Sequence, residues 1–142
     1  MRVLRSNDGV SAIEFAIISP VLITILLGIF QFGSAMNAYL VLTNAAAKGA
    51  LTMALGRGTA TPYTTTISAI AAAAPNLTPA SIATTVTING TACSTDAGCT
   101  TALVAGVSAV VRTTYPCNLT VMGINYAPSG CTLRAQTAQM VQ

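Results

Sequence analysis

The sequence predicts an α+β fold. A long N-terminal helix, with its first half in a membrane, carries a short second helix and a small antiparallel β-sheet of about three strands with two disulfide-closed loops. Three observations lead to this prediction: an uncharged apolar stretch from Phe15 to Phe30, threonine-rich alternating segments after residue 80, and four cysteines in the C-terminal half. Only 6% of the 142 residues are charged, against about 25% in an ordinary soluble domain. One membrane anchor and one small domain are therefore expected.

Residues 10–33 are predicted to form a transmembrane helix, preceded by a short leader, residues 1–9. The apolar segment is longer than the roughly 20 residues that a helix needs to cross the hydrocarbon core. Arg2 and Arg5 precede it closely, so the positive-inside rule places the N-terminus in the cytoplasm and the larger part of the chain outside. A cleaved secretory signal is the competing interpretation, although the residues after Phe32 offer a poor cleavage site.

Residues 34–58 are expected to continue the helix beyond the membrane, because they lack proline and are rich in Ala, Leu and Met. The glycines on either side of Arg57 are the predicted end of the helix. Residues 59–142 form the ectodomain, and a second helix is predicted at 61–75, with Thr61 as its N-cap and a proline at its end.

Three segments alternate apolar and polar residues as half-buried strands do: 81–90, 106–115 and 131–142. They are expected to form an antiparallel sheet with one face on the helices and Arg112 on the other face.

The cysteines predict two disulfides, since they are even in number and lie in the exported part of the chain. Their spacing favours Cys93–Cys99 and Cys117–Cys131. A zinc site is the alternative, but the C-x₂₋₄-C spacing and the histidines that zinc usually needs are absent from the sequence.

The sequence predicts no enzyme. It contains no histidine and three acidic residues, so no Ser-His-Asp or Cys-His set can be built. No cofactor, metal or small-molecule substrate is expected. The six basic residues are scattered and speak against nucleic acid: Arg2, Arg5, Lys48, Arg57, Arg112 and Arg134.

Glu14 is unusual because a charge within an apolar membrane helix costs on the order of 2–3 kcal/mol or more. One interpretation is that Glu14 reaches back to interfacial water. Alternatively, cleavage after Gly9 makes Val10 the new N-terminus, and its ammonium group pairs with the Glu14 carboxylate of a neighbouring subunit. Such pairing would drive and align side-by-side helix assembly.

The stretch "GVSAIEF" resembles a type IV prepilin cleavage motif, with glycine before the cut, glutamate at the fifth mature position and an aromatic residue next. The longer run "GVSAIEFAIISPVLITILLGIFQFG" is similar to the TadE-like family of tight-adherence (Flp) pilus systems. The matching positions are Gly9, Glu14, Phe15, Ala16, Pro20, Gly28, Phe32 and Gly33.

This resemblance implies a pseudopilin, a minor pilin-like subunit of the bacterial inner membrane with a periplasmic C-terminal domain. It implies processing by a prepilin peptidase between Gly9 and Val10, and assembly with other pilin-like subunits through Glu14, Phe15 and Pro20. Members often carry an acid where Gln31 stands and a basic residue where Ser34 stands, so a second ion pair in the membrane is not expected here.

Three alternatives remain at this stage. The first is an uncleaved membrane scaffold of the same pilus machinery. The second is a membrane-tethered periplasmic binding module, which would have no use for Glu14. The third is an anchored enzyme, against which the scarcity of titratable residues speaks.

Overall fold

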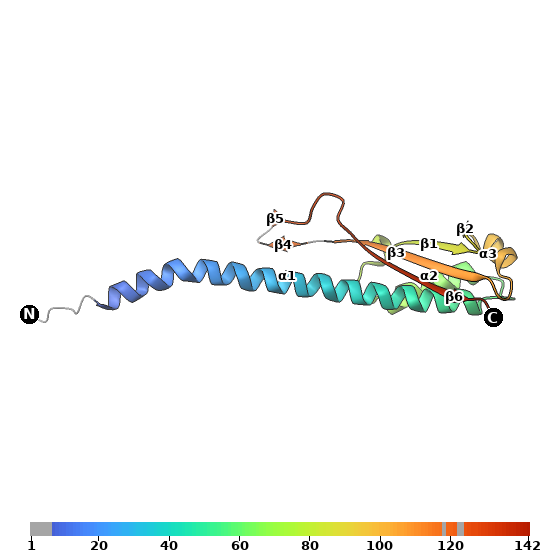
Figure 1. The fold of residues 1–142 in the computed structure, drawn as a ribbon, viewed down its shortest axis with the longest axis horizontal. Coiled ribbons are helices and arrows are strands. Elements are labelled where there is room, and N and C mark those ends of the chain that lie inside the picture. Colours follow the sequence, from blue (N-terminus) through green and yellow to red (C-terminus); the bar gives the residue numbers. More distant parts are fainter. Residues whose placement is uncertain (1–6, 118, 122–123) are drawn as a thin grey trace, which may run out of the picture.

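The structure is a computed structural model that describes residues 7–117, 119–121 and 124–142. One helix dominates it: α1 (Asn7–Leu55) runs the length of the molecule, and the other elements gather on its C-terminal half (Figure 1). The predicted stop is confirmed, because the helix ends directly before the two glycines, and Gly58 has a positive φ of 80°. The predicted leader lies mostly outside the described residues, but the helix already begins at Asn7, within it.

The second predicted helix is confirmed as α2 (Pro62–Ala73), which begins with a proline at its first turn. Thr61 occupies the predicted N-cap position, but its side chain caps no backbone N–H of the helix. The Asp96 carboxylate takes that place: it accepts from the Thr64 N–H at 2.9 Å and from the Thr64 hydroxyl at 2.6 Å. A residue 32 positions away in sequence thus satisfies the N-terminus of α2.

The sheet has four antiparallel strands in the order β2-β1-β3-β6 rather than the expected three. The three predicted strands are β1 (Ala83–Ile88), β3 (Ser108–Pro116) and β6 (Thr132–Met140). The additional edge strand is β2 (Thr91–Cys93), which pairs with β1 through a two-residue turn. Asn89 (φ 50°) and Gly90 (φ 81°) form this turn, and Asn-Gly is a strong signal for a two-residue hairpin.

The remaining elements are short. The 3₁₀ turn η1 (Pro79–Ser81) precedes β1, and α3 (Asp96–Ala102) follows β2. A separate small hairpin consists of β4 (Thr120–Val121) and β5 (Ile124–Asn125). This hairpin extends away from the main sheet and along α1 toward its N-terminal half (Figure 1).

One face of the sheet packs on the helices and forms the core. The buried strand residues alternate as predicted, with Val86 and Ile88 on β1 and Val111 on β3. Opposite them lie Leu42, Ala45, Ala46, Ala50 and Met53 of α1. Gly49 permits the close approach of α2, because a Cβ at this position would lie 2.6 Å from Cγ1 of Ile70.

The other sheet face is polar. Arg112 is exposed there, and its guanidinium donates to Oε1 of Gln136 at 3.0 Å and 2.7 Å. The sheet therefore has one buried and one solvated face, as expected for an antiparallel sheet.

Candidate functional site

The N-terminal half of α1 is an apolar surface that the rest of the chain leaves uncovered. The helix is long and apolar enough to cross a membrane, and none of its most apolar window is buried within the chain. Leu22, Ile25 and Phe30 are 52%, 55% and 71% exposed. A helix of this kind needs a lipid or protein environment, because large exposed apolar patches are unfavourable in water.

Glu14 lies on this apolar surface, one turn after Val10. Both side chains are exposed, Val10 by 56%. Residues four apart on a helix lie on the same face, about 6 Å apart along the axis. An α-amino group created at Val10 would therefore share a face with the Glu14 carboxylate. The Gly9–Val10 bond lies in the first turns of α1.

Phe15 and Pro20 are also placed on the exposed part of α1. Phe15 is 71% exposed and forms no part of the core. Pro20 lies inside the helix, where it has no N–H to donate to the carbonyl of Ala16. The Thr24 hydroxyl donates to the carbonyl of Pro20 at 2.8 Å. The helix axis bends in its N-terminal third (Figure 1), as a proline inside a helix leads one to expect.

Gln31 has a structural partner that the sequence did not reveal. Its side-chain Nε2 donates to the carbonyl oxygen of Thr120 at 2.6 Å. The two residues are 89 positions apart, and no periodicity or motif links them. This bond joins the β4–β5 hairpin to the apolar half of α1.

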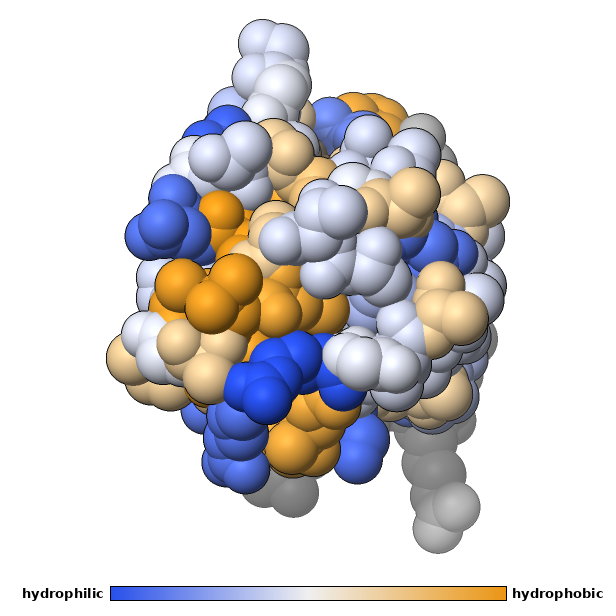
Figure 2. Space-filling model, turned by 90° about the vertical axis from the view of Figure 1, so that its right-hand side faces the viewer, coloured by the Kyte–Doolittle hydropathy of each residue, from blue (hydrophilic) through white to orange (hydrophobic). Residues whose placement is uncertain are grey.

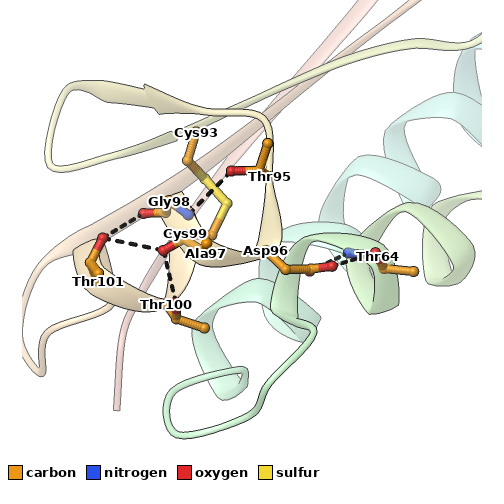
Figure 3. Close-up of a disulfide and its surroundings, with 9 residues drawn as sticks. All are labelled: Thr64, Cys93, Thr95, Asp96, Ala97, Gly98, Cys99, Thr100 and Thr101. Atoms are coloured by element: carbon orange, nitrogen blue, oxygen red, sulfur yellow. Dashed lines mark hydrogen bonds between the residues drawn. A yellow bond between two sulfur atoms is a disulfide. The ribbon is translucent and has the colours of Figure 1, made fainter.

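The two predicted disulfides are confirmed. Cys93 bonds Cys99 and Cys117 bonds Cys131, with Cα atoms 5.3 Å and 5.5 Å apart. The first pair holds α3 beside β2, and Asp96 extends from the start of α3 to α2 (Figure 3). Within the part of the chain that the structure describes, no group of three or more His, Cys, Asp or Glu residues is placed to hold a metal.

A second apolar surface lies at the end of the molecule farthest from the N-terminus. Figure 2 shows apolar residues gathered there in one patch among polar ones. Three exposed apolar residues lie at the ends of elements that reach this part of the molecule. Leu55 ends α1, Val104 follows α3 and Met140 ends β6, and they are 55%, 58% and 60% exposed. Apolar patches with a polar border are typical of contact surfaces.

Residues 9–51 match the family model described as TadE-like protein. The matched segment lies entirely within α1 and contains Val10, Glu14, Phe15, Pro20 and Gln31. Searches of curated proteins and of solved structures gave no match. The TadE-like match suggests a protein associated with Tad pilus systems. Because the match spans residues 9–51, the similarity lies in the helix and not in the sheet.

Proposed function

We propose, on the premise that residues 9–51 are a TadE-like segment, that this chain is a pseudopilin. In this role it is a minor subunit that takes part in assembling a tight-adherence type IV pilus. It is held in the inner membrane by α1, with the N-terminus in the cytoplasm and the sheet in the periplasm. Its action is structural and requires no catalysis, cofactor or small-molecule substrate.

The observation that carries this proposal is the exposed Val10–Glu14 pair on an uncovered apolar helix. The sequence has no basic residue between Arg5 and Lys48. The cation best placed to pair with Glu14 is therefore an α-amino group at Val10, produced by a prepilin peptidase that cuts after Gly9. Because both groups are exposed, the ammonium of one subunit can pair with the carboxylate of the next.

Pairing between subunits is favoured by the medium. An isolated carboxylate in hydrocarbon is costly, and a partner of opposite charge offsets that cost. The exposed side chains around Glu14, including Phe15, would pack against the helices of neighbouring pilin-like subunits. The ion pair then sets the axial register of these helices, while apolar packing contributes the contact area.

The test is the replacement of Glu14 in cells that carry the pilus system. We expect Glu14→Ala to leave membrane insertion intact or slightly improved, because it removes a charge from the helix. Cleavage should largely persist, since the scissile bond follows Gly9. Co-purification with other pilin-like subunits, and piliation, should be lost. Glu14→Asp, one methylene shorter, should be intermediate.

Ser11→Ala is the matched control, because Ser11 is an exposed polar residue of the same helix turn. It should behave like the unmodified protein. Normal pili in Glu14→Ala cells would mean that Glu14 only reaches interfacial water, and the proposal would fail. Loss of the variant from the membrane would mean that Glu14 acts in folding, which also contradicts the proposal.

A further inference from the structure

The β4–β5 hairpin belongs to a loop that the Cys117–Cys131 disulfide closes; we call the described residues of this loop, 117, 119–121 and 124–131, the arm. It is uncharged: the sequence has no Asp, Glu, Lys or Arg between Arg112 and Arg134. Two of its apolar side chains, Ile124 and Tyr126, are 59% and 64% exposed. The arm therefore presents apolar side chains outward, although the sheet beside it has a polar outer face.

The arm lies beside the apolar half of α1 and not beside the core. Gln31 holds it by donating to the Thr120 carbonyl. An apolar groove of about 410 Å³ runs between arm and helix. Its lining comes from α1 and the arm: Thr24, Gly28, Gln31, Phe32, Leu119 and Tyr126.

The position of this groove along α1 determines how deep the arm lies relative to the membrane. Its helical lining starts at Thr24, which lies about 12 Å before Phe32 along the axis. Both residues belong to the apolar stretch that ends near Phe32. If α1 crosses the membrane with this stretch, the arm cannot remain in the periplasm. It must lie within the outer half of the bilayer or at its boundary.

Several described backbone groups of the arm are hydrogen-bonded within it, which lowers the cost of placing them at that depth. The Tyr126 N–H donates to the Leu119 carbonyl at 2.9 Å. The Asn125 side-chain oxygen accepts from the N–H groups of Leu119 and Ala127, at 3.3 Å and 2.9 Å. β4 and β5 pair with each other.

We propose that the arm is a second membrane contact: it inserts into the outer boundary of the bilayer, where Ile124 meets acyl chains and Tyr126 lies at the headgroup level. Tyrosine prefers this level because its ring is apolar and its hydroxyl remains hydrated. Gln31 is the positioning residue that sets the depth of the arm. The inference rests on the proposed insertion of α1, and its occupant is phospholipid rather than another subunit.

The sequence contains no tryptophan, so single-tryptophan variants report depth without background. Tyr126→Trp tests the arm. Phe30→Trp reports the membrane helix, since Phe30 is 71% exposed on α1. Val104→Trp is the control outside the membrane, because Val104 is exposed and follows α3, which lies at the end of the molecule farthest from the N-terminus (Figure 1).

The full chain is reconstituted in vesicles of phosphatidylethanolamine and phosphatidylglycerol, with bromine on the upper acyl-chain carbons as quencher. We expect Tyr126→Trp and Phe30→Trp to show blue-shifted emission that the brominated lipid quenches. Val104→Trp should stay unquenched. Adding Gln31→Leu, which keeps side-chain size but removes the donor, should weaken quenching of Tyr126→Trp and leave Phe30→Trp unchanged.

The outcomes separate this inference from the proposed function. Unquenched Phe30→Trp would overturn the membrane insertion of α1, and the arm inference with it. If brominated lipid quenches Phe30→Trp but leaves Tyr126→Trp as bright as Val104→Trp, only the arm inference is overturned. Blue-shifted Tyr126→Trp emission that brominated lipid does not quench would mean that another protein copy covers the arm, which also contradicts the inference.

Discussion

Two threonine hydroxyls, those of Thr66 and Thr113, are fully buried and find no hydrogen-bond partner among the described residues. Burying a hydroxyl without a partner costs about 1–3 kcal/mol. The alternation in β3 predicted that Thr113 faces the core, and the structure confirms this. What alternation cannot predict is whether a buried hydroxyl finds an acceptor, because that depends on the elements packed against it.

We expect Thr113→Val to raise the free energy of unfolding by about 1 kcal/mol, since valine keeps the shape and removes the unpaired hydroxyl. Thermal unfolding of the detergent-solubilised protein measures this change. Thr114→Val is the matched control on the opposite strand face, where the hydroxyl donates to the Ala83 carbonyl at 3.4 Å. A melting temperature lower for Thr113→Val than for the original protein would show that the hydroxyl has a partner.

At the scale of elements, the sequence predicted those that are long enough to show a period. α1, α2, β1, β3 and β6 follow from apolar periodicity, proline positions and threonine-rich alternation. β2 and β4 have three and two residues, which is too short for alternation to appear. Thr95 is the N-cap of the seven-residue α3, and its side chain accepts from the Gly98 N–H, but the composition of α3 alone does not favour a helix.

Asp96 links α3 to the start of α2, and this link should make the stability of the ectodomain depend on pH. The hydrogen bonds from Thr64, first from its side chain and then from its backbone, hold the pKa of the Asp96 carboxyl below its usual value. A depressed pKa means that the carboxylate stabilises the fold above the unfolded pKa of about 3.9. That contribution is lost as the pH falls through the lower, folded pKa.

Asp96→Asn should therefore lower the melting temperature at neutral pH, and the difference from the original protein should shrink below about pH 4. Melting curves of the two proteins across this range measure it. Thr64→Val, which removes only the hydroxyl donor, should lower the melting temperature less than Asp96→Asn. A difference that stays constant with pH would rule out the carboxylate as the source of the effect.

The whole molecule is a long helix with a small domain on one half and an uncovered apolar surface on the other. The sequence revealed the uncovered half, because length, hydropathy and the Gly9–Glu14 spacing are local properties. It did not reveal the arm, since the contact between Gln31 and Thr120 joins residues 89 positions apart. Nor can a single chain show the partner of Glu14, if that partner belongs to a neighbouring subunit.

At the scale of the whole molecule, the proposed pseudopilin role depends on cleavage after Gly9. Under the proposed function, a chain cut after Gly9 would acquire the ammonium group that pairs with Glu14, whereas an uncut chain would remain a fixed membrane scaffold. Gly9→Val should prevent the cut, because a bulky residue replaces the glycine before the scissile bond. This variant should stay in the membrane but fail to enter assemblies.

The most direct measurement is the intact mass, with N-terminal sequencing, of the protein extracted from membranes of cells that contain the prepilin peptidase. We expect a chain that begins at Val10, and a longer chain from Gly9→Val cells. A chain that retains residues 1–9 in the presence of the peptidase would contradict the account and would favour the uncleaved scaffold.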